Sequence, residues 1–396
     1  ENVIDLMIGK INKLSEKNIN LLKLAACVGN WFWINVFVGI KKDDESETLS
    51  SIEYLANEGY FLVGGNEVKF THDKVLESVY SLLSEEEKAN NHYLIGKRYL
   101  ELADSKEYNV EDIVFTIVNQ LNQGVSHLAE EEKQRFIELN LMAGDRALAS
   151  SAYETGLDCY RIAMKFLSSD SWETSYEKTL GIYTKRAKLE SLTGHHEEAD
   201  QYFTIILEKT KTILEKVLVY EMQIPLYTGQ NKLREALDIG IKALSLLGMD
   251  FPEVHDPSPE VMKAFQLQGE RQIENLINLP KMESPEKLAM MRILTVSVIP
   301  AYITLPSLFP LTVLKMVNLT LEDNSLVNES GFAFVLYGII MGSGIGNYEL
   351  GNKLGKLGIQ IIEKLDAKNI KCTSFFFFPC MNNHWREHAK LDLPYF

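Results

Sequence analysis

The stretch from Val68 to Tyr80, VKFTHDKVLESVY, separates two kinds of sequence pattern. Val68 and Phe70 alternate with polar residues, which predicts a short strand, and the Gly-Gly-Asn turn just before it predicts a hairpin. Val75 and Val79 then fall at helical spacing. A hairpin therefore ends, and a helix begins, at a histidine.

The residues before this stretch predict a winged helix, in which helices are closed by a two-stranded wing. Ile52 and Leu55, together with Leu49 and Tyr54, are expected to face the core from the last of these helices. The predicted helices cover residues 2–14, 18–28, 31–40 and 46–59, and the predicted strands cover 60–63 and 67–70.

A winged helix that reads DNA carries Arg and Lys on its recognition helix. The corresponding helix of this chain carries Glu45, Glu47, Glu53 and Glu58 instead. The whole chain has a net charge of -15, which repels nucleic acid and anionic membranes. We therefore expect no nucleic acid and no membrane as partner, and a mechanical or nucleotide-sensing role for this domain.

The residues from Ser84 onwards predict a helical array. Ser84 and Glu87 have the spacing of a capping box, and a helical stretch follows at 110–129. The helices then come in pairs: 134–149 with 151–167, 173–192 with 195–212, 214–229 with 231–247, and 328–341 with 347–365. A small residue recurs early in the second helix of these pairs, namely Gly156, Ala199, Ala236 and Gly351. This pattern predicts an α-α superhelical solenoid with tetratricopeptide-like repeats.

We expect a mainly α chain of three parts: a winged helix over 1–83, helical repeats over 84–250, and continuing repeats over 251–396 that are truncated at the C-terminus. The pattern loosens between 247 and 284, where a single helix is predicted over 259–278.

An uncharged window from Ile293 to Leu314 is long enough to cross a membrane. It contains Pro300, Pro306 and Pro310, which interrupt a spanning helix. Two short buried helices joined by a proline turn are the favoured interpretation.

The four cysteines lie far apart in the sequence, which is typical of a reduced, cytoplasmic protein. The first residues alternate apolar with charged side chains and form no secretory signal. The abrupt start indicates a piece of a longer protein.

Two clusters invite a chemical interpretation. The glycine-rich residues 342–353 lack the spacing of a phosphate loop, and a turn between paired helices explains them better. Cys380, His384 and His388 recur at intervals of four and could bind zinc, but their distance from Cys372 exceeds the usual ligand spacing. No metal site and no catalytic residues are therefore expected, although a hydrolytic or metal enzyme built on the Cys/His cluster stays as an alternative.

His72 has two interpretations. A histidine before a helix is most often a capping or packing residue, and Thr71 or Asp73 could also cap the free N–H groups. Alternatively, its imidazole donates a hydrogen bond to a diphosphate that a neighbouring domain holds.

The chain resembles the STAND class of signalling ATPases, and most of all the multidomain serine/threonine kinase/ATPase/sensor histidine kinase group. The resemblance rests on LLKLAACVGNWF (21–32), VKFTHDKVLESVYSLLSEEEKANNHYLIGKRYL (68–100) and ELNLMAGDRALASSAYETGLDCYRIAMKFL (138–167), and it extends over the whole chain. In that group a kinase-like domain and a nucleotide-binding ATPase domain precede a winged helix and a tetratricopeptide-like array.

The resemblance implies a non-catalytic regulatory module. ATP or ADP with Mg would bind in the full-length protein only, on an upstream nucleotide-binding domain that is itself the first partner. His72 and Asp73 match a methionine-histidine-aspartate motif whose histidine touches the diphosphate, with Thr71 in place of the methionine. A protein partner or ligand is expected on the solenoid.

A second family has a similar organisation. The maltose-type transcription activators also join an ATPase, a winged helix and a helical array, but they carry a separate DNA-reading domain at the C-terminus. The absence of retardation in a gel shift at low salt would exclude this alternative.

Overall fold

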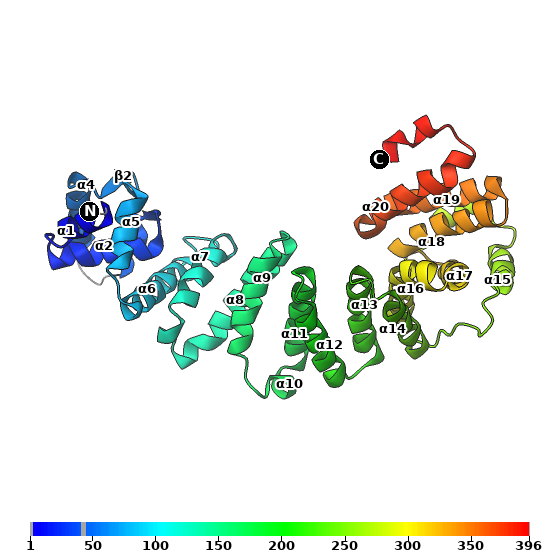
Figure 1. Ribbon diagram of the computed structural model, residues 1–396, viewed down its shortest axis with the longest axis horizontal. Coiled ribbons are helices and arrows are strands. Elements are labelled where there is room, and N and C mark those ends of the chain that lie inside the picture. The colour runs from blue at the N-terminus through cyan, green and yellow to red at the C-terminus, as the bar shows by residue number, and fades with distance from the viewer. Residues whose placement is uncertain (1–2, 41–44, 396) are drawn as a thin grey trace. The chain divides into compact units, whose positions relative to one another are not determined.

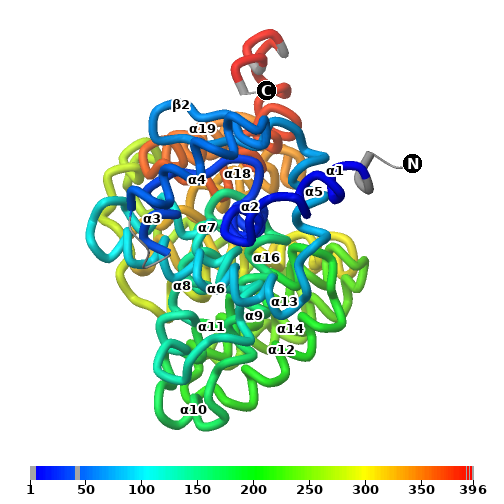
Figure 2. The backbone as a smooth tube through the Cα atoms, turned by 90° about the vertical axis from the view of Figure 1, so that its left-hand side faces the viewer, coloured from blue at the N-terminus to red at the C-terminus, as the bar shows by residue number. Residues whose placement is uncertain are grey.

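The computed structural model describes residues 3–40 and 45–395, and its fold is mainly α-helical (Figure 1). The chain divides into two compact units, Glu1–Thr193 and Gly194–Phe396. Figure 2 follows the backbone through both units in the same colours, from blue at the N-terminus to red at the C-terminus.

The first unit combines a small sheet with a series of helices. Its elements in chain order are α1 (Val3–Ile11), α2 (Glu16–Val28), β1 (Trp31–Trp33), α3 (Ile34–Ile40), α4 (Glu45–Asn57), β2 (Phe61–Gly64), β3 (Glu67–Phe70), α5 (Asp73–Ser81), α6 (Glu85–Asp104), α7 (Val110–Gln123), α8 (Lys133–Ala149), α9 (Tyr153–Lys165), α10 (Ser171–Thr174) and α11 (Tyr176–Leu192).

The predicted hairpin is present, and it belongs to a three-stranded antiparallel sheet in the order β1-β3-β2. Phe61 pairs with Phe70, and Gly64 pairs with Glu67. Gly65 lies in the connecting turn at φ +63, a backbone conformation that favours glycine. Apart from the added strand β1, the described helices and strands up to α5 follow the predicted order, and the assignment as a winged helix stays a prediction.

The strand β1 corrects the helix predicted over 31–40, because only α3 of that stretch is helical. Phe32 is buried and pairs with Val68, whereas Trp31 is exposed. Three residues are too short for their alternation to stand out from the apolar helix that follows directly.

The prediction for α4 is half right. Ile52 and Leu55 are buried, but Leu49 and Tyr54 are 39% and 45% exposed. The buried face of α4 is completed by the small polar residues Thr48 and Ser51, which an apolar pattern does not reveal.

One hydrophobic core runs from α2, α5 and the three-stranded sheet into α6, α7 and α8. It contains Phe37 and Val79 together with Ile95, Val114 and Phe136, all of which are buried. The predicted capping box at the start of α6 is confirmed: Ser84 Oγ accepts from the Glu87 amide at 3.2 Å, and Glu87 Oε2 accepts from the Ser84 amide at 2.8 Å. The packing therefore continues without interruption from the sheet into the helices.

The second unit consists of helices around a second hydrophobic core. Its helices are α12 (His196–Lys209), α13 (Ile213–Gly229), α14 (Leu233–Leu246), α15 (Ser258–Gln268), α16 (Pro285–Thr304), α17 (Leu308–Asp323), α18 (Asn328–Ile339), α19 (Tyr348–Lys364) and α20 (Lys368–Phe377), and π-helices continue α18 to Gly344 and α20 to Asn382.

The helix predicted over 259–278 is broken in the structure. It consists of α15 and a 3-10 helix from Ile273 to Asn278. The break follows Gly269, which ends α15 with a positive φ of +57, a backbone conformation that favours glycine.

The uncharged window near residue 300 forms two helices, α16 and α17, as predicted, but they are 20 and 16 residues long rather than short. Pro300 lies inside α16, and Pro310 lies in the first turn of α17, where its missing N–H has no partner to lose. Among the described residues α16 alone is long and apolar enough to cross a membrane, and 44% of its apolar window is buried. A helix in a protein core can have the same length and apolar composition.

The small residues predicted at helix contacts are confirmed where α18 meets α19. A Cβ atom on Gly351 would lie 2.7 Å from the Gly338 oxygen and 2.9 Å from the Gly342 nitrogen. Ala199 and Ala236 are fully buried, and a Cβ on Gly156 would lie 3.3 Å from the Gly144 oxygen. Small side chains therefore let neighbouring helix backbones approach each other closely.

Candidate functional site

His72 lies where β3 passes into α5. It is the N-cap residue of α5 with extended backbone angles (φ −149, ψ 143), and its carbonyl accepts from the Val75 amide at 3.0 Å. Its side chain makes no capping hydrogen bond, and the side chains of His72 and Asp73 are exposed. The nucleotide-sensing role of the two residues stays a prediction.

The predicted capping of α5 by Thr71 or Asp73 is wrong. The Thr71 hydroxyl donates to the Gly59 carbonyl at 2.8 Å and so ties the end of β3 to the segment before β2. Asp73 is the first residue of α5, where its charge suits the positive end of the helix. The N-cap position belongs to His72, although its ring is not used for capping.

A buried polar network joins α2 and α5 to α6 and α7. Gln120 Nε2 donates to the Cys27 carbonyl at 3.0 Å, so its Oε1 accepts from His92 Nδ1 at 2.7 Å. His92 Nε2 is left to accept from the Tyr80 hydroxyl at 3.3 Å. Burial lowers the pKa of His92, and nearby Lys88 lowers it further, whereas the hydrogen bond to Gln120 raises it. The net lowering favours the neutral ring.

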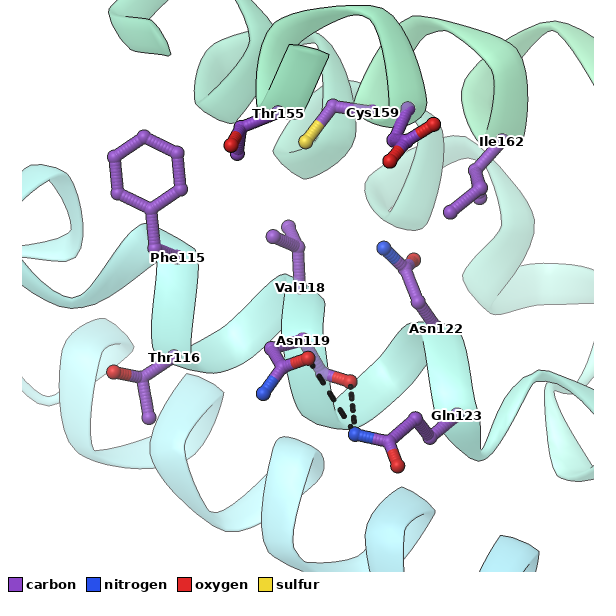
Figure 3. A pocket seen from close by; sticks show the side chains of 10 residues that line it. Phe115, Thr116, Val118, Asn119, Asn122, Gln123, Thr155, Cys159 and Ile162 are labelled. Atoms are coloured by element: carbon purple, nitrogen blue, oxygen red, sulfur yellow. Dashed lines mark hydrogen bonds between the residues drawn. The ribbon is translucent and has the colours of Figure 1, made fainter. Parts of the chain in front are cut away.

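A groove of about 620 Å³ opens between α7 and α9 (Figure 3). Val118 and Cys159 form its floor, and Phe115 and Ile162 add apolar contacts at its sides. Its polar lining consists of Thr116, Asn119, Asn122, Gln123, Thr155 and Asp158. We call it the α7–α9 groove.

The polar side chains of the α7–α9 groove are partly fixed. Asn122 and the fully buried Asn140 exchange two amide hydrogen bonds of 3.0 Å each, which holds Asn122 at the groove wall. Gln123 donates to the Asn119 carbonyl at 3.2 Å (Figure 3). Asn119 and Thr155 are exposed on facing helices, so their polar atoms can meet a bound molecule.

The structure does not gather a metal site from Cys380, His384 and His388. The regular helix ends at Phe377 and continues as π and 3-10 turns, so a spacing of four residues no longer places side chains on one face. His384 Nδ1 lies 3.2 Å from the Pro379 carbonyl, and His388 Nδ1 accepts from the Lys390 amide. Within the part of the chain that the structure describes, no three His, Cys, Asp or Glu residues could hold a metal ion.

The predicted turn between paired helices is present within the glycine-rich residues 342–353, between the π-helix that ends at Gly344 and the start of α19 at Tyr348. Gly346 has φ +84, and the Asn347 side chain caps α19 by accepting from the Leu350 amide at 3.1 Å. The element directly before this turn is the helix α18 with its π-helical extension, whereas a phosphate loop follows a strand.

Sequence reasoning missed both the polar network and the α7–α9 groove. The signal for the network was present, because Gln120 is a polar residue on the apolar stripe of α7. The groove has no such signal, since its walls come from helices whose spacing only the fold determines.

Three comparisons place the chain among known proteins. A scan against protein-family models found no match. The chain is 20% identical, over its full length, to the hybrid signal transduction histidine kinase G of Dictyostelium discoideum, of which it spans 14%. This similarity agrees with the resemblance to multidomain signalling proteins that the sequence predicted.

A comparison with solved structures also found a similarity. It is the STAND protein with a tetratricopeptide repeat sensor from Pyrococcus horikoshii, at 12% identity and a TM-score of 0.34, covering the whole chain and 58% of that protein.

Proposed function

We propose that this chain is a non-catalytic regulatory module of a multidomain, ATP-binding signalling protein in the cytoplasm. Its helical repeats bind a protein partner or ligand, and the winged helix of residues 1–83 passes that state to an upstream nucleotide-binding domain. The similarity to a signalling histidine kinase, which extends over the whole of this chain, supports this proposal. The contacts of α7 on its two faces support it as well.

The position of α7 carries the proposal. One face of this helix supplies Asn119 and Gln123 to the α7–α9 groove, whereas Gln120 on the other face reaches Cys27 of α2 through the buried network. Interiors packed at this density transmit displacements rather than absorbing them. A molecule that shifts α7 therefore also shifts Cys27 on α2 and His92 on α6, which are hydrogen-bonded to Gln120.

The α7–α9 groove suits an extended peptide segment. Its amide and hydroxyl side chains can pair with peptide N–H and C=O groups, and Phe115 and Ile162 offer apolar contact between them. Such binding would act by a population shift between a closed form that retains diphosphate and an open form that assembles.

Filling the groove tests this proposal. Thr155 is exposed on α9, so Thr155→Trp should block the groove without disturbing the core. In the intact protein we expect this substitution to abolish the signal-dependent change in autophosphorylation, measured in the host cells. Thr204→Trp, at an exposed position of α12, is the matched control and should leave the response unchanged. A normal response of the Thr155→Trp protein would contradict the proposal.

A further inference from the structure

A second cavity lies within the second unit, between α13, α16, α18 and α20. Its volume is about 270 Å³, near the lower end of the range of about 300 to 1,000 Å³ that is usual for ligand pockets. Phe332 and Ile370 are buried apolar residues in its wall, and Ile299 lies at its exposed edge. The cavity therefore has room for a small molecule with an apolar body.

A buried carboxyl group faces this cavity. Glu329, in the first turn of α18, is 5% exposed and lines the cavity wall. Its Oε1 accepts one long hydrogen bond, 3.4 Å from Asn369 Nδ2, and it has no ion pair with any residue that the structure describes. Burial raises the pKa of Glu329 above its ordinary 4.5, against smaller opposing effects of its backbone, Arg292 and Asn369.

The charges around the cavity do not balance. Arg292 also lines the cavity and its charge acts on Glu329, but its Nε already donates to Glu221 Oε2 at 2.8 Å. Once Glu329 is ionised, the cavity holds two carboxylates and one guanidinium. A buried carboxylate without a counter-ion is costly, so this site favours a positively charged occupant.

We propose that this cavity binds a small organic ammonium ion, with the nitrogen on the Glu329 carboxylate and the apolar body against Phe332 and Ile370. A carboxylate ligand is disfavoured because Glu329 and Glu221 both repel it, and Glu221 already accepts a hydrogen bond from Nε of Arg292. A bare metal ion is disfavoured because most of the wall is apolar. We call this site the amine cavity.

The amine cavity is distinct from the α7–α9 groove. If the module is a sensor, the cavity adds a small-molecule input to the second unit, and that part of the inference rests on the proposed function. The binding itself does not, because it is measured on the chain without any signalling readout.

Isopentylammonium chloride is the probe, and isopentanol is its neutral counterpart. We expect calorimetric titration of the chain to show saturable binding of the amine, about tenfold or more tighter than the alcohol, because hydrogen bonds to charged groups are the stronger kind. Affinity for the amine should rise with pH as Glu329 loses its proton, since the ionised carboxylate is the partner of the ammonium group.

Two substitutions test the assignment. Glu329→Gln keeps the shape of the side chain and should remove both the preference for the amine and its pH dependence. Ile299→Trp at the exposed edge should close the cavity and weaken the binding of both probes, whether or not the Glu329 variant folds. Glu349→Gln, at an ion pair on the surface of α19, is the matched control and should bind as the unaltered chain does.

Equal binding of amine and alcohol, or binding of neither, would overturn the inference. So would unchanged amine affinity in a folded Glu329→Gln chain or in the Ile299→Trp chain. These outcomes leave the effect of Thr155→Trp on signalling unaffected, so failure of the amine cavity and failure of the proposed function are distinguishable.

Discussion

At the scale of single residues, the ring of His92 shows how a polar group can join two parts of a fold. His92 lies on α6, and its ring is hydrogen-bonded to Tyr80 of α5 and to Gln120 of α7. Gln120 in turn donates to the Cys27 carbonyl of α2. With the imidazole neutral, each group in this chain of hydrogen bonds has a partner, and burial favours that neutral form.

The stability of the chain should therefore depend on the protonation of His92. The pKa of His92 is lowered in the folded state, so its contribution to the unfolding free energy is complete above the ordinary pKa of 6.5 and is lost as pH falls below it. Urea unfolding between neutral and mildly acidic pH should show this loss. His92→Asn keeps a donor for Gln120 and should flatten the pH dependence, whereas His196→Asn at an exposed position should not. An unchanged slope in His92→Asn would refute the prediction.

The exposed ring of His72 is suited to contact a second domain. In the intact protein, His72→Ala should speed the release of bound diphosphate, because a hydrogen bond to a charged group contributes about 1.5 to 3 kcal/mol. Nucleotide release is followed with a fluorescent diphosphate analogue. His127→Ala, elsewhere in the first unit, serves as the control, and equal release rates for the unaltered protein and His72→Ala would remove the sensor role.

At the scale of elements, the contact between α18 and α19 depends on glycine. Gly351→Ala would place a methyl group within 3 Å of the Gly338 and Gly342 backbones, which must then separate. We expect a loss of about 2 kcal/mol of unfolding free energy, as for other overpacked contacts. Gly181→Ala, inside α11 with open space around it, should instead stabilise by about 0.5 to 1 kcal/mol. Denaturant unfolding measures both, and a neutral Gly351→Ala would contradict the packing described.

The sequence predicted most elements because their apolar spacing is long and regular, as in α8, α9 and α13. It failed where a few residues decide the structure: Trp31–Trp33 pair with β3 through a contact distant in sequence, and Gly269 divides one helical pattern into two pieces. Glu329 escaped notice for a related reason. A single acidic residue in the first turn of a helix is ordinary, and only the fold places it in a cavity wall.

At the scale of the whole molecule, each unit has its own hydrophobic core. Repeat proteins with several local cores lose all-or-none unfolding. We therefore expect two transitions in urea, followed by tryptophan fluorescence and circular dichroism. Gly351→Ala should lower the midpoint of the transition of the second unit. His92→Asn should alter the pH dependence of the transition of the first unit. A single transition that both substitutions shift together would show that the units unfold as one.

The cysteines of the chain differ in chemical reactivity. Burial raises the pKa of Cys27 and of Cys159 to about 11, so neither forms much thiolate at neutral pH. Cys372 is exposed, whereas Cys380 is half-buried. A maleimide dye should therefore attach first to Cys372, on the same helix as Ile370 in the wall of the amine cavity. The natural sequence thus provides a labelling position from which fluorescence can follow ligand binding without any engineered cysteine.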